Sequence, residues 1–281
     1  MSGKIVVITG ASSGIGLLAA VELARRGHRV VATMRDLSRR GRLDEAAAAA
    51  GLGGHVDVRR LDVTEFDSIP TVVSEIVRDH GRIDALVNNA GFAMAGFAED
   101  LKLEEIRLQL ETNFFGHVAV TKAVIPTMRA QRSGHIIMIS SISGRAASPV
   151  TSSYAASKFA LEGWSEALRI ELRSLGIRVV LVEPGAFQTD IWDRNLRLGE
   201  FAAAPESPNH ERGQRFAEFV KTKVHKRDAR LVAELIARIA EDPNPKLRYR
   251  IGPDAHLTFW LRALLPWKAY ERLLQRATHI D

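Results

Sequence analysis

Cysteine is absent from this 281-residue chain. Its absence excludes disulfide bridges, thiolate metal sites and cysteine nucleophiles, and it is compatible with a reducing compartment. Long apolar runs are also missing: the best candidate, Phe259 to Trp267, is interrupted by Arg262 and Pro266, whereas a membrane span needs about 20 apolar residues. The segment Met1–Lys4 leads directly into an apolar stretch and shows no signal peptide. We therefore expect a soluble, cytoplasmic protein.

Patterns for binding metals or nucleic acids are missing too. His210 and Glu211 stand without a second histidine at metal spacing, and His117 reads as an ordinary helix residue, so no metal site is expected. The net charge of +6 is uneven, because residues 191–281 hold 17 Lys+Arg against 12 Asp+Glu and so account for +5 of it. These basic segments lack the aromatic interleaving of a nucleic-acid surface. A solvated face is the favoured interpretation; an acidic substrate, an acidic partner or a membrane surface is the alternative.

Strand and helix patterns alternate along the chain. The first apolar run, Lys4–Thr9, is rich in β-branched residues, as is typical of a buried parallel strand. Further strands are expected near residues 29–33, 56–61, 83–87, 135–139, 177–182 and 249–251. A long helix is expected around Glu104–Ala130, stopped by Gly134, and other helices fill the remaining intervals. This alternation predicts an α/β fold with a parallel sheet covered by helices on both faces.

A glycine-rich turn, Gly10-Ala11-Ser12-Ser13-Gly14-Ile15-Gly16, follows the first strand and precedes a helical pattern. Such a context suits a phosphate-binding loop, because glycines let the backbone approach the ligand and the helix N-terminus supplies free N–H groups. The spacing is Gly-x-x-x-Gly-x-Gly, not the Gly-x-Gly-x-x-Gly of the general dinucleotide fingerprint. A bare turn would explain the glycines alone, but their position between strand and helix favours nucleotide binding.

The end of the second strand bears on the choice of cofactor. In this architecture an acid at that place contacts the ribose of NAD, whereas an arginine accommodates the 2′-phosphate of NADP. Here the strand ends in Thr33-Met34-Arg35-Asp36, so the acid comes late and after an arginine. We favour NADP(H), with Arg35 on the phosphate and Ser13 assisting. The alternative is NAD(H), with Asp36 on the ribose and Arg35 in solvent.

Tyr154 and Lys158 are the candidate acid/base pair. Four residues apart on a helix, they lie one turn apart on the same face. A free phenol titrates near ~10, and a nearby ammonium lowers that pKa. The spacing alone also describes an aromatic side chain packed beside a solvated lysine. However, polar clusters at the ends of other strands, such as Asn88–Gly91 and Ser140–Gly144, are expected to converge on the same crevice.

Taken together and in order, these motifs resemble the short-chain dehydrogenase/reductase superfamily in its compact single-domain form. The matching motifs are Thr9-Gly10-x-x-x-Gly14-Ile15-Gly16, Leu61-Asp62-Val63, Asn88-Asn89-Ala90-Gly91, Asn113, Ser141, Tyr154-x-x-x-Lys158, and Pro184-Gly185 with Thr189. The resemblance implies one Rossmann-type domain over residues 1–281, with a doubly wound parallel sheet of seven strands in the order 3-2-1-4-5-6-7. Its expected parts are a cofactor and catalytic core (1–190), a substrate flap (191–228), a last helix and strand (229–254) and a C-terminal helical extension (255–281).

The resemblance also implies roles for individual residues. Asn113, Ser141, Tyr154 and Lys158 look like a complete catalytic tetrad. Ser141 is preferred to Ser140 because its separation from Tyr154 fits the family pattern, and it would hydrogen-bond the substrate carbonyl while Tyr154 donates the proton. Lys158 would hold the nicotinamide ribose and, with the positive nicotinamide ring of the oxidised cofactor, lower the Tyr154 pKa. Asn113 would position a water that links Lys158 to bulk solvent. The residues implied along the cofactor cleft are Asp62, Val63, Asn89, Ala90, Gly91, Lys122, Pro184, Gly185, Phe187 and Thr189.

The implied activity is that of an NADP(H)-dependent carbonyl reductase or alcohol dehydrogenase. The run Ala32–Leu37, the chain length and the C-terminal extension are most similar to the NADP-preferring hydroxysteroid and retinol-type branch. Aromatics in the expected flap, namely Trp192, Phe201, Phe216 and Phe219, favour a bulky hydrophobic substrate, although ordinary packing would explain them equally. The alternatives are the same redox step within an epimerisation or dehydration, and a cofactor-binding regulator without catalysis.

The C-terminal segment Leu257–Ile280 predicts two short amphipathic helices split by Pro266. Packing against the domain or a subunit partner is favoured. Attachment to a membrane surface is the alternative, because aromatic residues stand beside Arg262, Lys268 and Arg272. Family members usually associate through the helices that would carry Asn113 and Tyr154, so a homodimer or homotetramer is expected.

Overall fold

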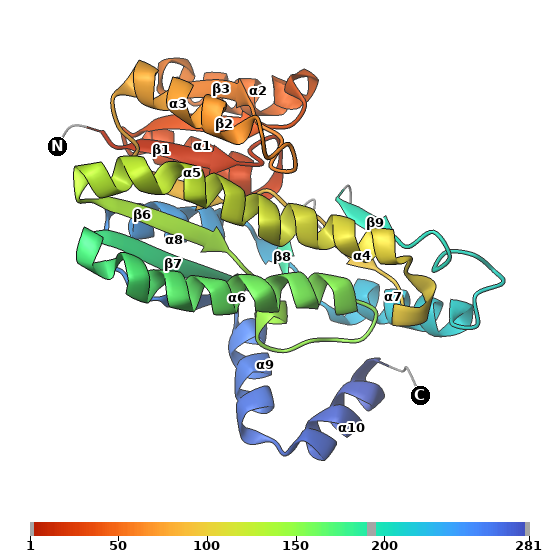
Figure 1. Cartoon of the computed structure of the whole chain (residues 1–281). Helices are drawn as coiled ribbons and strands as arrows, with labels where there is room; N and C mark the ends of the chain where they lie inside the picture. The colour runs from red at the N-terminus through yellow and green to blue at the C-terminus, as the bar shows by residue number, and fades with distance from the viewer. Residues whose placement is uncertain (1–2, 190–194, 279–281) are drawn as a thin grey trace.

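Figure 1 shows the computed structural model, which describes residues 3–189 and 195–278. Seven strands form one sheet in the order β3-β2-β1-β4-β6-β7-β11, and every neighbouring pair is parallel. The strands are β1 Ile5–Thr9, β2 Arg29–Met34, β3 Val56–Arg60, β4 Ala85–Asn88, β6 Gly134–Ile139, β7 Ile177–Pro184 and β11 Arg248–Ile251. The order equals 3-2-1-4-5-6-7 for these strands, so the predicted doubly wound parallel fold is confirmed.

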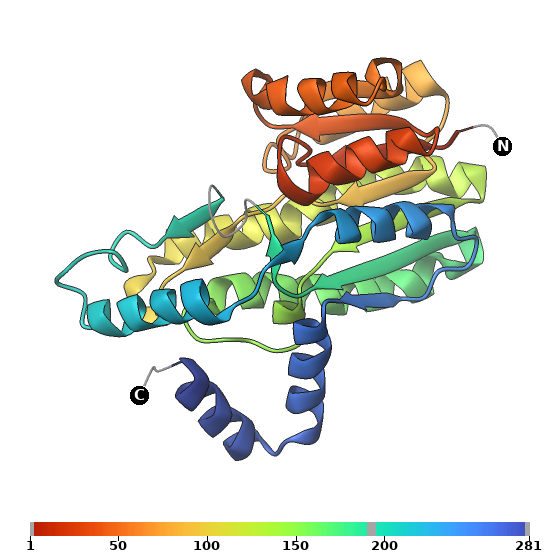
Figure 2. The same cartoon turned by 180° about the vertical axis from the view of Figure 1, so that it is seen from behind.

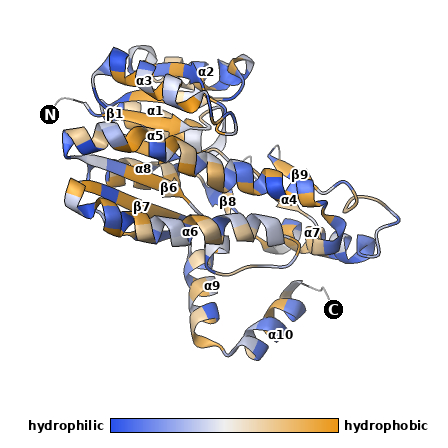
Figure 3. Ribbon diagram, in the orientation of Figure 1, coloured by the Kyte–Doolittle hydropathy of each residue, from blue (hydrophilic) through white to orange (hydrophobic). Residues whose placement is uncertain are grey.

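Helices cover both faces of this sheet (Figures 1 and 2). One layer consists of α1 Gly14–Arg25, α2 Gly41–Ala49 and α8 Arg230–Glu241; the other consists of α3 Ile69–His80, α5 Gly116–Gln131 and α6 Ser152–Leu172. Because strand side chains alternate, Val6 and Ile8 pack toward the first layer and Val7 toward the second. Figure 3 shows the hydrophobic strands between the two layers. The β-branched runs in the sequence are therefore strands buried on both sides.

The long helix expected around Glu104–Ala130 is interrupted. It consists of α4 Leu103–Leu110, a π-helical turn at Glu111–Phe115 (η4) and α5. The prediction that Gly134 stops the helix was wrong: α5 ends at Gln131, Arg132 takes a left-handed backbone conformation (φ 56°), and Gly134 already belongs to β6. π-turns often mark functional positions, and this one contains Asn113.

The chain after β7 takes part in two short parallel strand pairs outside the main sheet. The sequence did not predict them. β5 Ala93–Ala95 pairs with β9 Leu196–Leu198, and β8 Phe187–Gln188 pairs with β10 Arg227–Asp228. Between β9 and β10 runs the helix α7 His210–Lys223. The described part of the expected flap is thus joined by backbone hydrogen bonds to the ends of the central strands.

The C-terminal extension forms α9 Pro253–Leu264 and α10 Trp267–Thr278, so the predicted pair of helices divided at Pro266 is confirmed. Figures 1 and 2 show both helices standing away from the sheet, with α9 leaving the body after β11. Within residues 3–189 and 195–278, no helix is both long and apolar enough to cross a bilayer.

Candidate active site

A cavity of about 310 Å³ lies at the C-terminal edge of the sheet, where strand ends from both halves meet. It gathers most of the residues that the sequence motifs singled out. Those lining it are Gly10, Ser12, Ser13, Gly14, Ile15, Arg35, Asp62, Val63, Asn89, Ala90, Gly91, Ser141, Tyr154, Lys158, Pro184, Gly185, Phe187 and Thr189. Three expected residues are not in this lining: Asn113, Gly16 and Lys122. Lys122 is exposed on α5, so its expected position along the groove was wrong.

The glycine-rich turn is locked to the loop that follows β4. Asn89 Nδ2 donates to the carbonyl oxygens of Thr9 and Gly10, both at 3.0 Å, and Thr9 Oγ1 accepts from the backbone N–H groups of Asn89 and Ala90. Gly10 has φ 69°, and a Cβ there would lie 2.7 Å from Ala90 Cα. A Cβ on Gly16 would collide with the Gly10 carbonyl, so Gly16 serves the packing of the turn rather than the cavity wall. The turn thus brings backbone to the N-terminus of α1 as a phosphate site requires.

The far end of the cavity carries two arginines. Arg35 extends from the end of β2 with a side chain that is 62% exposed, and its Nε lies 3.9 Å from Asp62 Oδ2. Arg39, which the sequence analysis missed, lines the same end from the short helix η1 Leu37–Arg40. Asp36 is turned toward this helix, where its Oδ1 accepts from Ser38 N–H at 2.9 Å. Hydrogen bonds from the Ser38 hydroxyl and from its backbone N–H lower the Asp36 pKa. Asp36 and Asp62 also line this end, so the two arginines lie there beside two carboxylates.

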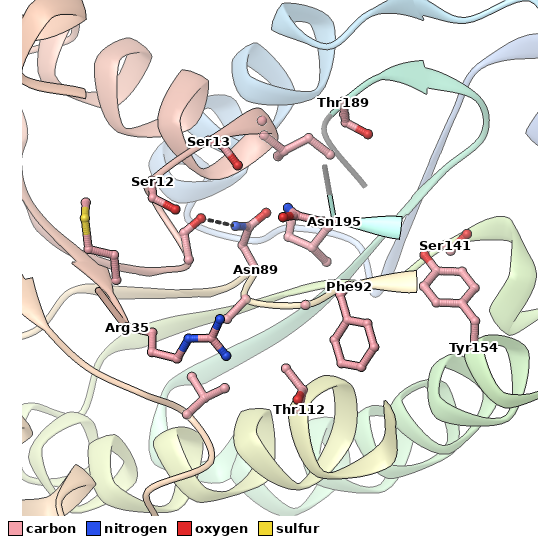
Figure 4. A pocket seen from close by; sticks show the side chains of 18 of the residues that line it. Ser12, Ser13, Arg35, Asn89, Phe92, Thr112, Ser141, Tyr154, Thr189 and Asn195 are labelled. Atoms are coloured by element: carbon pink, nitrogen blue, oxygen red, sulfur yellow. Dashed lines mark hydrogen bonds between the residues drawn. The ribbon is translucent and has the colours of Figure 1, made fainter. Parts of the chain in front are cut away.

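The candidate acid/base group lies at the opposite end (Figure 4). Tyr154 is 3% exposed on α6, and its phenol hydrogen-bonds the Ser141 side chain, which caps the short helix after β6. Ser141 Oγ also accepts from Ser143 N–H at 3.1 Å, which leaves the Ser141 proton free to be donated. Lys158 Nζ lies 5.7 Å from the Tyr154 ring centroid and donates to the Ile139 carbonyl at 2.8 Å. Ser141, Tyr154 and Lys158 are therefore brought together as the motifs implied.

The electrostatics of the phenol differ from the expectation. Burial raises the pKa of Tyr154 to about 12, and the hydrogen bond from Ser141 only partly opposes this. Burial likewise lowers the pKa of Lys158 to about 8, against the opposing effect of Glu162. Among the protein's own groups, desolvation dominates the Tyr154 phenol, and Lys158 Nζ faces its ring. The phenol thus keeps its proton at neutral pH. The lowering of the Tyr154 pKa by Lys158 together with an oxidised nicotinamide stays a prediction.

Asn113 lies behind the cavity wall and is fully buried. Its Oδ1 accepts from Phe92 N–H at 3.1 Å, and its Nδ2 donates to the Phe92 carbonyl at 2.9 Å and to Ser157 Oγ at 3.4 Å. The side chain is therefore committed to the loop after β4 and to α6. A water-positioning role would fall to the main chain of the π-turn.

A family model described as short chain dehydrogenase matches residues 4–197. The chain belongs to the short-chain dehydrogenase family. The uncharacterized oxidoreductase YusZ of Bacillus subtilis is 43% identical over 98% of this chain and 99% of its own. A 3-ketodihydrosphingosine reductase of Bacteroides thetaiotaomicron is 37% identical over 92% of this chain and 91% of its own. Human retinol dehydrogenase 8 is 44% identical over 72% of this chain and 65% of its own length.

Solved structures of short-chain dehydrogenases share the fold. One from Streptomyces avermitilis superposes with a TM-score of 0.82 at 31% identity and covers 98% of both chains. A metagenomic short-chain oxidoreductase in complex with NADP superposes with a TM-score of 0.71 at 27% identity, covering 89% of this chain and 97% of its own. The first of these likenesses extends through the C-terminal helices.

The cavity of this short-chain dehydrogenase is also lined by residues that the sequence motifs did not include. Phe92 and Leu108 are apolar, whereas Asn195 and Arg197 are polar, and the Arg197 guanidinium lies 4.6 Å from the centroid of the Phe92 ring. β9 places Arg197 there by pairing with β5, a contact without a local signal in the sequence. The aromatic residues of the expected flap were used to predict a hydrophobic substrate site. Phe201, Phe216 and Phe219 do not line the cavity, and Trp192 lies outside the described residues.

A buried network of ion pairs, which the sequence did not predict, joins α6, the helix that carries Tyr154 and Lys158, to the strands β7 and β11. Arg248 Nε, from β11, lies 3.0 Å from both Glu162 Oε2 and Glu183 Oε1. Glu162 follows Lys158 by one helical turn, and burial raises the pKa of Glu162 to about 7. Arg250 Nε lies 3.1 Å from Glu183 Oε2. Two acidic side chains sharing one arginine thus join α6, β7 and β11 one helical turn from Lys158.

His117, expected to be an ordinary helix residue, is fully buried one turn after Asn113. Its Nε2 donates to the Ala90 carbonyl at 2.7 Å, and its Nδ1 is buried without a hydrogen-bond partner among the described residues. Burial, reinforced by the charge of Lys158, lowers the pKa of His117 to about 3 from its ordinary value of 6.5. The imidazole is therefore neutral and fixes the loop that carries Ala90.

This burial predicts an acid-sensitive fold. Between about pH 6.5 and pH 3 the unfolded chain binds a proton that folded His117 does not, so the free energy of unfolding falls as the pH drops. His117→Gln should remove up to about 1.4 kcal/mol per pH unit of that fall. Urea denaturation of both proteins at several pH values measures the difference, and His55→Gln, at an exposed position, is the control. Parallel pH curves for His117→Gln and wild type would contradict the assignment.

Proposed function

We propose that this protein is an NADP(H)-dependent oxidoreductase that interconverts a ketone or aldehyde with its alcohol. The observation that carries the proposal is the arrangement of one cavity. A hydrogen-bonded serine and tyrosine lie beside a buried lysine at one end, and two arginines line the other, with the glycine-rich turn between them. The neighbour crystallised with NADP supports the choice of cofactor.

The residues present fit a nicotinamide dinucleotide. The turn Gly10–Gly16 presents close-packed backbone at the N-terminus of α1, which suits the pyrophosphate. Asp62 and Val63 would flank the adenine, Thr189 would contact the carboxamide, and Lys158 would hold the nicotinamide ribose. When bound, the cofactor supplies the hydride for reduction, and the protein orients it.

The side chains of the tetrad then have separate tasks. Ser141 Oγ accepts from a backbone N–H, and its own proton, directed at the Tyr154 phenol, would turn to the substrate carbonyl oxygen when a substrate lies between the two hydroxyls. Tyr154 is protonated at neutral pH, since its pKa is about 12, and can donate that proton as negative charge develops on the same oxygen. Lys158, with its pKa near 8, keeps a positive charge nearby at neutral pH. A protonated Tyr154 is the form that can act as general acid in carbonyl reduction.

The arginines Arg35 and Arg39 predict a preference for NADPH over NADH. Arg35→Ala/Arg39→Ala should weaken NADPH by about 2 kcal/mol, or about 30-fold, while NADH changes little, because a charge-assisted contact to the 2′-phosphate is lost. Titration of the tryptophan fluorescence with each nucleotide measures both affinities. Arg25→Ala, at an exposed position outside the cavity, is the control. An unchanged ratio of the two affinities would refute the phosphate role and favour Asp36 with NADH.

We further propose a hydrophobic, lipid-like substrate. Phe92 and Leu108 supply an apolar wall near the tyrosine, and two relatives, by their names, act on a ketodihydrosphingosine and on retinol. Arg197 and Asn195 would face the polar part of such a molecule. The decisive experiment is nucleotide oxidation by full-length protein with short and long-chain ketones and aldehydes, run in parallel with NADPH and NADH. No oxidation with any carbonyl compound, despite nucleotide binding, would overturn the proposed activity.

We also propose that the protein is a homodimer formed through the outer faces of the helices that carry Asn113 and Tyr154. Phe115 on the π-turn is 46% exposed, and Phe159 and Ile170 on α6 are 47% and 79% exposed. Such apolar side chains on adjoining helices suit a subunit contact. Light scattering of the full chain, with Phe159→Glu as the disrupting variant, tests this assembly.

A further inference from the structure

The outer face of α9 is apolar and exposed. Leu257, Trp260 and Leu264 follow one another at helical spacing, and Trp267 comes next beyond the break at Pro266. Their exposed fractions are 61%, 54%, 72% and 58%, respectively. We call Leu257, Trp260, Leu264 and Trp267 the α9 stripe. Because α9 stands away from the sheet in both views, the stripe is presented outside the body of the domain (Figures 1 and 2).

The neighbouring helix α10 is an amphipathic helix with one side packed on the domain. Tyr270 and Thr278 are buried on its inner side, and the helix contacts α7. Beyond Trp267, its exposed residues include five polar or charged ones and one large apolar one, namely Lys268, Glu271, Arg272, Gln275 and Arg276, and Leu273, which is 41% exposed. An ordinary amphipathic helix packed on its own domain therefore explains α10, as the sequence analysis favoured, but it does not explain α9.

The inner side of α9 is already occupied. Asp254 Oδ2 accepts from Ala186 N–H at 2.6 Å, which ties the start of the helix to the turn after β7. Phe259 faces the body, with the Arg250 guanidinium 3.5 Å from its ring centroid. Rotating α9 to bury the stripe would break both contacts. The stripe is thus held in an outward position by the fold.

The two helices that carry the α9 stripe have more cationic than anionic side chains. The two helices carry Arg262, Lys268, Arg272 and Arg276 against Asp254 and Glu271, and Asp254 is engaged toward the body. The Arg262 guanidinium lies 4.9 Å from the centroid of the Trp267 ring, so a cation sits directly at one end of the apolar surface. Tryptophan and leucine beside lysine and arginine are the composition of helices that lie in the interfacial region of a bilayer.

A second copy of the chain suits this surface poorly. A stable protein interface takes about 20–30 residues a side, whereas the stripe offers four. A two-fold contact would also bring Arg262 and Lys268 of one copy against the same cations of the other. Anionic lipid complements these charges instead. We propose that the α9 stripe inserts into the surface of an anionic lipid bilayer and docks the enzyme there, independently of the proposed activity.

Co-sedimentation of the full-length protein tests this docking. The probes are phosphatidylcholine vesicles and mixed phosphatidylcholine/phosphatidylglycerol vesicles. Wild type should sediment with the mixed vesicles much more than with the neutral ones. Trp260→Ser/Leu264→Ser should lower the partition coefficient on mixed vesicles at least tenfold. The matched control is Leu103→Ser/Leu231→Ser, which removes two apolar side chains of 56% and 42% exposure from other helices, outside the proposed dimer contact, and should bind like wild type.

The charge requirement has its own variant. Lys268→Glu/Arg272→Glu should weaken binding to the mixed vesicles, and added salt should weaken the wild type in the same direction. Circular dichroism, with activity on a water-soluble carbonyl compound, shows whether each variant is folded, because none of these residues lies in the cavity.

Three outcomes would overturn the docking. Wild type could stay in the supernatant with both kinds of vesicle. The stripe variant could bind the mixed vesicles as well as the control does. Alternatively, light scattering could show that the stripe variant turns a dimer into a monomer while no lipid binding occurs, which would make the stripe a protein interface.

Discussion

Tyr154→Phe is expected to lower kcat for carbonyl reduction by about 10²–10⁴-fold, while NADPH affinity stays within about threefold of wild type. The change removes the one hydroxyl that can give a proton to the developing alkoxide and leaves the ring in place. Since Tyr154 is 3% exposed, water replaces its proton poorly. Nucleotide binding should persist, because the glycine-rich turn and Lys158 are untouched. Loss of kcat without loss of nucleotide affinity would identify Tyr154 as the general acid.

Steady-state kinetics and nucleotide titration on the same preparation measure the two quantities. Tyr249→Phe is a matched control, because it deletes a phenol that accepts from Lys246 N–H at 3.0 Å outside the cavity. That variant should keep kcat within about twofold. Activity of Tyr154→Phe within tenfold of wild type would remove Tyr154 from the proton transfer.

The fold could be predicted from the sequence because its buried strands have a recognisable local composition. Ile177–Pro184 and Gly134–Ile139 are short β-branched runs buried on both faces, and each begins just after a turn. Their order then follows from right-handed crossovers and from the family resemblance. The residues at their C-terminal ends meet in one cavity for the same reason, since parallel strands end at the same edge of the sheet.

Two features could not be predicted from the sequence, namely the π-turn and the buried ion pairs of Arg248. They depend on helix geometry and on contacts between distant segments. The apolar pattern runs unbroken through Glu111–Phe115, so nothing local marks the π-turn. Arg248 reads as a solvated residue of a short strand. Only the pairing of β11 with β7, which sets Arg250 opposite Glu183, brings these arginines to buried carboxylates. A spacing signal did exist for Glu162, which lies four residues after Lys158 on the same helical face.

The sign of the Tyr154 pKa shift shows the limit of spacing arguments. Two residues four apart on a helix are neighbours, but the position of the charge relative to the hydroxyl depends on tertiary structure. Lys158 Nζ is drawn to the Ile139 carbonyl and faces the tyrosine ring, while burial dominates the phenol. A cofactor ribose held by Lys158 would bring further polar groups to the phenol, and so the pH profile with and without nucleotide should differ.

Ser141→Ala should lower kcat by about 10²–10³-fold, because it removes a donor aimed at the oxygen on which charge develops. The neighbouring Ser140 provides a matched control in the same loop. Ser140 also lines the cavity and is 3% exposed, but the hydrogen bond to Tyr154 comes from Ser141. A Cβ on Gly144 would meet both Ser140 Oγ and Glu162 Cγ, which places the Ser140 hydroxyl toward the ion network behind α6. Ser140→Ala should therefore change kcat less than tenfold.

Single-turnover reduction with saturating NADPH separates this effect from binding. Ser141→Thr keeps a hydroxyl at the same position and should recover part of the activity lost in Ser141→Ala. The pH dependence of kcat is a second readout. Because the Ser141 hydrogen bond lowers the Tyr154 pKa, Ser141→Ala should move the alkaline limb of the kcat profile to higher pH. If Ser140→Ala loses more activity than Ser141→Ala, the two serines exchange roles, and the separation from Tyr154 that selected Ser141 is not a valid guide.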